Sequence, residues 1–388
     1  MKPAAPNLAG EDAPILVELR VRLEATDDPV ERAALRIRQA LYLARTHRLP
    51  DAQALVPELR EHWEQRGSAP QALRVFVWLW LLEGVLDFYT TSRTKGRTRL
   101  LQAQAAAGKA GWRAERELAS AWLAHLAYVE NDYPAMLAGL QDSGLGTAAL
   151  EESMARSSQT MACALQWFGH SQLAGEWFAR ARAVALRTGD RAGIMAATAN
   201  RAMLRLSDNW LSFAFGEALP HDAAGLRQEL QAILGYEQLS GSASLQEQNE
   251  IARVHLAVLR GDDQQAMAQL SQMVSAQQRH SVAALTMAAV EQAWLQARQA
   301  KPLAAQSALQ AAQQAMSKAA SAGLDEDDAA ACVALMAQLA QRAGDAVTAA
   351  DLRRQAEAAR ARSMQVRAVH QADLLAVESE ARAHWPTG

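Results

Sequence analysis

The 388-residue chain has little of what most folds are built from: only two cysteines, 5% aromatic residues and almost no alternating runs of Val, Ile and Thr. Because such alternating runs are typical of strands, their near absence argues against a β-sheet. Cys163 and Cys332 lie 169 positions apart, both in apolar helical context. They exclude a disulfide framework, fit a reducing cytoplasm and are expected to be buried thiols.

The chain also lacks a strong charge of either sign and a long apolar run. The formal net charge is −3, from 39 basic and 42 acidic residues, so no clustered basic face indicates nucleic-acid binding. The N-terminal stretch Met1–Pro14 has no apolar core of a signal peptide. The most apolar stretch, Leu73–Tyr89, includes Glu83 and Asp87 and is too short and charged to span a membrane. We expect it to form a helix buried on most sides.

The residue patterns of common catalytic and metal sites are missing as well. None of the nine histidines has another histidine three or four positions further on, so no helical zinc pair is present. The sequence has no phosphate-binding glycine loop, no dinucleotide-binding glycine motif and no nucleophile-elbow motif. The acidic run Asp325–Asp328 follows Gly323 at the start of a predicted helix, so we interpret it as a cap. We predict no catalytic residue, no metal and no cofactor.

Several arginines alternate with apolar residues in the first predicted helices. This alternation favours a solvated helix face over a phosphate site. The residues are Arg20, Arg22, Arg32, Arg36, Arg38, Arg45 and Arg48.

What the sequence does contain is a helix-pair pattern that recurs about every forty residues. Strong helix formers dominate the chain. The clearest copy of the pattern combines small residues, a bulky residue and a turn glycine, as two closely packed antiparallel helices require. Its positions are Met161, Ala162, Leu165, Gly169, Ala174, Phe178 and Ala181. Such a pair cannot bury its own apolar face and must stack on neighbouring pairs.

These residues resemble the tetratricopeptide repeat family. A second copy contains Ala293, Ala305, Leu309 and Ala312, and a third contains Ala337, Gly344, Asp345, Ala349 and Ala356. The family's signature tryptophan is absent, since Ser120, Ser158 and Ala289 occupy its place. The longer period resembles the helical sensor regions of bacterial regulators. The resemblance implies binding of a peptide or protein, without catalysis.

We therefore predict an all-α protein: a right-handed α-solenoid of about seven to eight antiparallel helix pairs with a long C-terminal helix. Residues 1–12 are expected to be disordered, 13–360 to form the solenoid, and 361–388 to extend the last helix and form a tail. The aromatic segment Asp208–His221 is expected to interrupt the pattern as a loop that folds back on the solenoid or meets a partner.

The last helix is predicted to run from Ala346 to about Ala383, since nothing in that stretch breaks it. Its apolar residues form a rough stripe over the distal half. Such a helix either caps the solenoid or pairs with a second molecule. In the second case, a homodimer would be centred on Val366, Val369 and Leu374.

The family's inner-surface positions, carried onto this register, give a candidate groove. Polar groups with one aromatic ring suit hydrogen bonding to an extended peptide, although side chains that are merely solvated would give the same pattern. The residues are His125, Tyr128, Arg156, Gln159, Gln166, Asn200 and Met203. We predict a cytoplasmic, non-enzymatic sensor or adaptor. The alternatives are an architectural or dimerising protein that acts through its C-terminal helix, and an enzyme with an unrecognised site.

Overall fold

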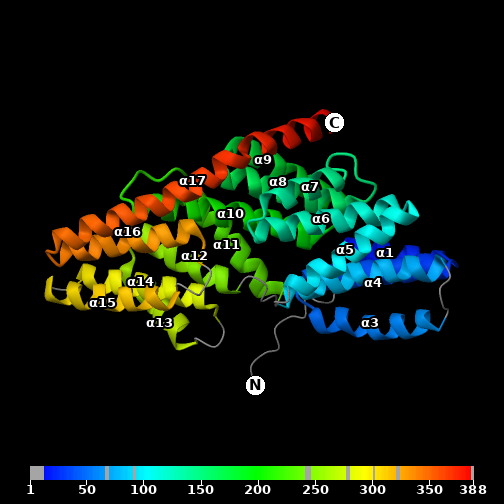
Figure 1. Ribbon diagram of the computed structural model, residues 1–388. Coiled ribbons are helices and arrows are strands. Elements are labelled where there is room, and N and C mark those ends of the chain that lie inside the picture. Colours follow the sequence, from blue (N-terminus) through cyan, green and yellow to red (C-terminus); the bar gives the residue numbers. More distant parts are fainter. Residues whose placement is uncertain are drawn as a thin grey trace, which may run out of the picture. The chain divides into compact units, whose positions relative to one another are not determined.

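The computed structural model describes residues 13–65, 70–90, 93–240, 246–276, 280–299, 302–319 and 324–385 (Figure 1). The predicted disorder of residues 1–12 lies outside these residues. The described chain contains helices and no strands, as predicted. The helices are α1 (Pro14–Ala25), α2 (Pro29–Arg45), α3 (Leu49–Glu64), α4 (Pro70–Tyr89), α5 (Arg93–Ala110), α6 (Arg113–Val129), α7 (Tyr133–Asp142), α8 (Glu151–Trp167), α9 (Ser171–Arg187), α10 (Arg191–Ala214), α11 (Ala223–Ser240), α12 (Gln246–Leu259), α13 (Asp263–Ser275), α14 (Val282–Gln299), α15 (Pro302–Ala319), α16 (Glu326–Arg342) and α17 (Ala346–Ala383).

After α1, these helices form eight successive pairs, from α2 with α3 to α16 with α17, and this confirms the all-α solenoid. The small residues predicted at helix crossings are buried: Ala162 and Ala174 are inaccessible to solvent, and Ala181 nearly so. In the α6–α7 pair, a Cβ added to Gly139 would lie 3.0 Å from the backbone of Ala124. Close backbone approach is therefore what the small residues of the pattern permit.

The predicted turns also have the expected chemistry. Gly169 and Gly189 adopt positive φ angles of 85° and 65° at the ends of α8 and α9, a conformation that glycine adopts without strain. The next residue after Gly189, Asp190, donates its backbone N–H to the carbonyl of Ala185 at 2.8 Å. These bonds satisfy the last carbonyls of each helix and reverse the chain into the next one.

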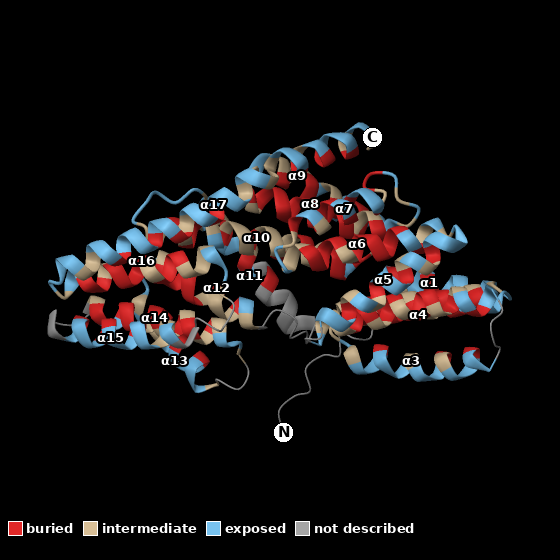
Figure 2. Ribbon diagram, viewed as in Figure 1, coloured by how far each residue is buried: buried red, intermediate tan, exposed pale blue. Residues whose placement is uncertain are grey.

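The chain divides into two compact units. Unit 1 consists of residues 1–201, 235–244 and 370–388, and unit 2 of residues 202–234 and 245–369. In each, apolar residues on the facing sides of paired helices form the core, and polar residues cover the opposite sides (Figure 2). The long helix α17 confirms the predicted C-terminal helix; its sequence contributes to both units.

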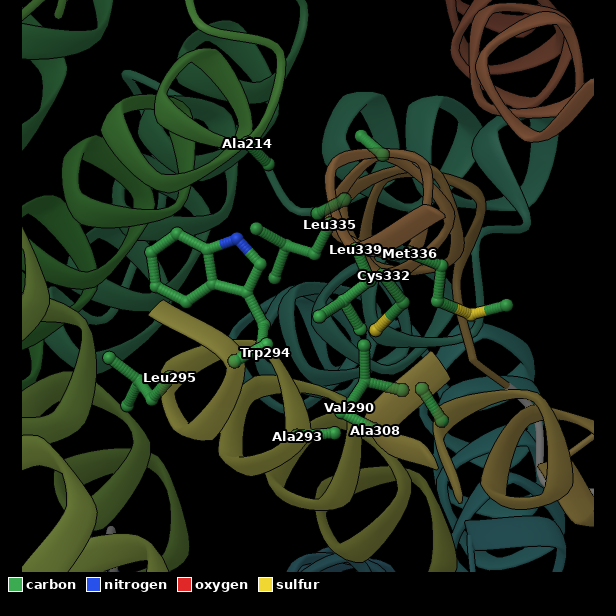
Figure 3. Close-up of a cluster of buried hydrophobic side chains, with 14 of the residues drawn as sticks. Ala214, Val290, Ala293, Trp294, Leu295, Ala308, Cys332, Leu335, Met336 and Leu339 are labelled. Atoms are coloured by element: carbon green, nitrogen blue, oxygen red, sulfur yellow. The ribbon is translucent and has the colours of Figure 1, made fainter. Parts of the chain in front are cut away.

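The core of unit 2 is built mainly from α14 and α16, and Trp294 is one of its buried residues (Figure 3). The indole Nε1 of Trp294 donates to the side chain of Gln338 at 2.8 Å. The Gln338 amide in turn donates to the backbone carbonyl of Ala214, also at 2.8 Å. The polar tip of a large buried ring is thus satisfied, as burial requires.

The expected loop at Asp208–His221 is wrong for its first half. Helix α10 continues through this segment as far as Ala214, because Trp210 and its apolar neighbours keep the helical period. Trp210 is buried and stacks on His255, with ring centroids 3.9 Å apart. The side chain of Asn209 bonds both the N–H and the carbonyl of His221, at 2.9 and 3.0 Å. The aromatic segment therefore packs within unit 2.

Two smaller expectations, on the cysteines and on the acidic run, are confirmed. Cys163 and Cys332 are free and buried. Asp325 caps α16 by accepting from the backbone N–H of Asp328 at 2.7 Å, as the capping interpretation predicts. Within the described ranges, none of the helices is long and apolar enough to cross a membrane. In the same residues, no group of three or more His, Cys, Asp or Glu is placed to hold a metal ion.

Candidate functional site

Unit 1 contains a narrow internal cavity of about 30 Å³. Four of its walls come from helices far apart in the sequence: α2, α6, α8 and the start of α10. Helix α1 closes one side with Ile15. A cavity of this volume holds about two water molecules. The side chains that give it its chemical character are Arg38, Tyr42, Arg45, Trp122, Glu152, Arg156 and Gln159.

Helical periodicity explains why these residues converge. Glu152, Arg156 and Gln159 follow one another at intervals of four and three on α8, and this spacing places them on one face. Arg38 and Arg45 lie two helical turns apart on α2 and share a face in the same way. The site is therefore built from one side of each helix, and its surroundings are apolar.

Two ion pairs connect α2 to distant parts of unit 1. The Nε of Arg38 donates to a carboxylate oxygen of Glu152 at 2.8 Å. Arg45 pairs with Asp190 at 2.5 Å, and Asp190 also accepts the backbone N–H of Gly193 at 2.8 Å. Burial would lower the pKa of Arg45, but the neighbouring Asp190 carboxylate outweighs it and the pKa is raised. Both carboxylates are thus already engaged by arginines of α2.

Arg156 is in a different situation. Its side chain is only 7% exposed, and its guanidinium carbon lies over the indole ring of Trp122, 4.0 Å from the ring centroid. Among the described residues it forms no ion pair, and its hydrogen-bond partner is the side chain of Tyr89. Burial lowers the pKa of Arg156, and the nearby positive charge of Arg45 contributes in the same direction. A buried cation without its own counter-charge is energetically unfavourable.

His125 of α6 lies beside Arg156. Its Nδ1 is 3.4 Å from the hydroxyl of Thr160, which donates to the carbonyl of Arg156 at 3.1 Å. Burial, and then the positive charge of Arg156, lower the pKa of His125 well below its usual value. The imidazole is therefore neutral at pH 7 and adds no second positive charge beside Arg156.

The predicted groove residues are distributed as follows. Arg156 and Gln159 line the cavity, His125 lies beside Arg156 without lining it, and all three are buried. Gln166 is also buried, but its amide donates to Ser171 at 3.1 Å, near the end of α8. Tyr128 and Asn200 are half-buried elsewhere in unit 1, and Asn200 bonds the thiol of Cys163. Met203 is half-buried and belongs to unit 2.

The interpretation of the early arginines as a solvated face is wrong for Arg38 and Arg45, whose side chains are each 13% exposed. Their partners Glu152 and Asp190 lie 114 and 145 positions away, so local patterning gives no sign of the pairs. The sequence contains one weak indication that these residues are buried. Arg38, Tyr42 and Arg45 are separated by intervals of four and three, the spacing of one face of a helix.

The three residues predicted for self-association differ in their exposure to solvent. Val366 and Val369 are exposed, in the part of α17 that belongs to unit 2. Leu374 is fully buried, in the part that belongs to unit 1.

No family model matches the sequence, and no match is found among curated proteins. Among solved structures, the chain is similar to a crystal structure of a Rap protein complexed with competence and sporulation factor. The TM-score is 0.57 at 12% sequence identity, over 87% of this chain and 100% of that one. At this identity the similarity concerns the fold, which is that of a helical-repeat protein. Membership of the tetratricopeptide family stays a prediction.

Proposed function

We propose that this chain is a non-enzymatic binding module, a sensor or adaptor, and that it holds a peptide or protein partner at the inner faces of α6 and α8 in unit 1. The observation that carries the proposal is the pair Arg156 and Gln159. Both line the cavity and are more than nine-tenths buried. Among the described residues, Gln159 makes no hydrogen bond and Arg156 no ion pair. Buried polar groups of this kind are normally satisfied, so a ligand is the natural source of the missing partners.

Two neighbouring hydroxyl groups of α8, those of Ser157 and Thr160, do not compete for that role. The hydroxyl of Ser157 donates to the carbonyl of Ser153 at 2.8 Å, and Thr160 bonds the carbonyl of Arg156. Their hydrogen bonds are thus completed within the helix, as is common for these residue types. Only the longer side chains of the same face extend into the cavity.

The comparison supports the same class of function. The solved structure of similar fold is a complex in which a helical-repeat protein, a Rap protein, is complexed with competence and sporulation factor. We transfer from it only the general idea of a helical-repeat protein that binds a partner.

A peptide library tests the proposal. The intact chain is immobilised and screened against phage-displayed random dodecapeptides, and the enriched sequences are made as synthetic peptides. We expect a convergent consensus whose binding weakens at least tenfold in Gln159→Ala. The exposed Gln341→Ala is the matched control and should bind as the unchanged protein does. Failure to enrich any consensus would overturn the proposal.

The alternative function, an architectural protein that dimerises through α17, has one observation in its favour. Met364, Val366 and Val369 are 60%, 40% and 64% exposed, and exposed apolar residues on one helix are typical of interaction surfaces. The burial of Leu374 within unit 1 restricts such a contact to the part of α17 before residue 370.

A further inference from the structure

The charges around the cavity of unit 1 do not balance. Three arginines surround it: Arg38 and Arg45 from α2 and Arg156 from α8. In the part of the chain that the structure describes, two carboxylates pair with them, Glu152 and Asp190. The nearby His125 is neutral at pH 7, because burial lowers its pKa well below the usual value. The surplus is therefore one positive charge, inside a region from which water is largely excluded.

Neither carboxylate is available to neutralise Arg156. Glu152 is engaged by Arg38. Asp190 uses one oxygen for Arg45 and the other for the backbone N–H of Gly193, in the first turn of α10. Asp190 is close enough to favour the charged form of Arg156, but a direct pair would require it to leave a partner that is itself buried. Among the described residues, no further carboxylate is placed to compensate the charge of Arg156, and a bound ligand can supply one.

The arrangement around Arg156 defines what that charge can be. One face of the guanidinium is covered by Trp122, and its N–H donors lie in the plane of the group, so an anion that accepts hydrogen bonds from it binds along its edge. A carboxylate is planar, carries a single negative charge and forms two parallel hydrogen bonds to a guanidinium edge. Its two oxygens replace about the two water molecules that the cavity holds. A phosphate group is bulkier and carries nearly two negative charges, which exceeds the surplus.

We propose that Arg156 and Gln159 form a subsite for one carboxylate group of the bound peptide. The inference rests on the proposed function and specifies its ligand. The Arg156 guanidinium pairs with the carboxylate, and the Gln159 amide donates a further hydrogen bond from the next turn of α8. The carboxylate belongs either to an acidic side chain or to a free C-terminus, and the two sources share this chemistry.

The first test compares two arginines of the same cavity in the ligand-free chain. Arg45→Gln leaves Asp190 buried without its partner and should lower the Tm by roughly 5 °C or more. Arg156→Gln removes an uncompensated charge, can still bond Tyr89, and should leave the Tm unchanged or raised. A loss in Arg156→Gln as large as that in Arg45→Gln would show that Arg156 is a structural partner and would overturn the subsite.

The second test uses three synthetic libraries of random nonapeptides on the full chain. The first has acidic residues and an amidated C-terminus, the second has a free C-terminus without Asp or Glu, and the third has no carboxylate. We expect retention of the first or the second, which identifies the source, and at least tenfold weaker retention of the third. Arg156→Gln should abolish the difference.

The failures of the two proposals are distinguishable. If the carboxylate-free library binds as well as the others, the protein still binds peptides but the carboxylate subsite is wrong. If none of the three libraries is retained, the peptide-binding function itself is contradicted, and the subsite with it.

Discussion

The indole Nε1 of Trp177 donates a hydrogen bond to the carboxylate of Glu378 at 2.9 Å, and both side chains are buried in unit 1. The bond joins α9 to the end of α17, 201 positions further along the chain. Arg382 reinforces it by pairing with Glu378 at 2.8 Å and with Glu176 at 2.8 Å. The end of α17 is thus fixed in unit 1 by polar contacts as well as by the burial of Leu374.

Trp177→Phe should therefore lower the free energy of unfolding by about 1–3 kcal/mol, because the buried carboxylate loses its indole donor. Trp385→Phe is the matched control: Trp385 contacts the Trp177 ring edge to face, with centroids 5.7 Å apart, and is only half-buried. Chemical denaturation followed by circular dichroism measures both. Equal losses in the two variants would mean that ring contact, and not the hydrogen bond to Glu378, holds the helix end.

Two glycines inside helices should respond to alanine in opposite directions. In Gly139→Ala, the new methyl group would lie 3.0 Å from the Ala124 backbone, and overpacking should cost about 1–3 kcal/mol. A Cβ at Gly175 in α9 meets nothing within 4 Å. Gly175→Ala should stabilise the protein by about 0.5–1 kcal/mol, because alanine loses less backbone entropy in a helix. The same sign of change in both variants would refute the helix crossing described for α6 and α7.

Asp328, in the first turn of α16, gives a pH dependence. Burial, together with the negative charges of Asp325, Asp327 and Glu291, raises its pKa well above the usual value. A carboxyl with a raised folded-state pKa stabilises the fold fully below its unfolded pKa, near 4, and loses that contribution as pH rises through the folded pKa. Asp328→Asn should match the unchanged protein near pH 3 and become the more stable of the two as pH rises.

Thermal unfolding of both proteins between about pH 3 and 8 checks this expectation, with the exposed Glu357→Gln as control. A stability difference that is constant over the range would show that Asp328 does not titrate abnormally. If the protein with Asp328 is the more stable of the two at high pH, the pKa of Asp328 is lowered in the folded state and not raised.

The dimerisation alternative makes its own prediction. If α17 pairs with a second copy, light scattering of the full chain at tens of micromolar should give twice the monomer mass of 42.0 kDa. The double variant Val366→Glu, Val369→Glu should then be monomeric, because both side chains are exposed where the contact would form. A monomeric unchanged protein at that concentration rules this alternative out.

The sequence was sufficient for the repeat architecture because its determinants are local. The turn glycines, such as Gly169, and the small crossing residues, such as Ala174, act within one helix pair and recur with the repeat. The full length of α10 was not predicted, because the aromatic residues near Trp210 resemble a loop until their packing on His255 is known.

The candidate site was predictable only in part. His125, Arg156 and Gln159 follow from the repeat register, since each is at an inner position of a first helix. Arg45 and Asp190 could not be paired from the sequence, because 145 positions separate them. Their contact depends on how successive pairs rotate relative to one another, a sum of small packing angles that no local pattern specifies.

Amide hydrogen–deuterium exchange with a library-selected peptide tests the central claim most directly. Bound peptide should slow exchange along α8 and α6 of unit 1, two of the helices that line the cavity, and this protection should disappear in Arg156→Gln. Protection confined to unit 2, or equal protection of α8 in Arg156→Gln, would contradict a ligand site at the cavity.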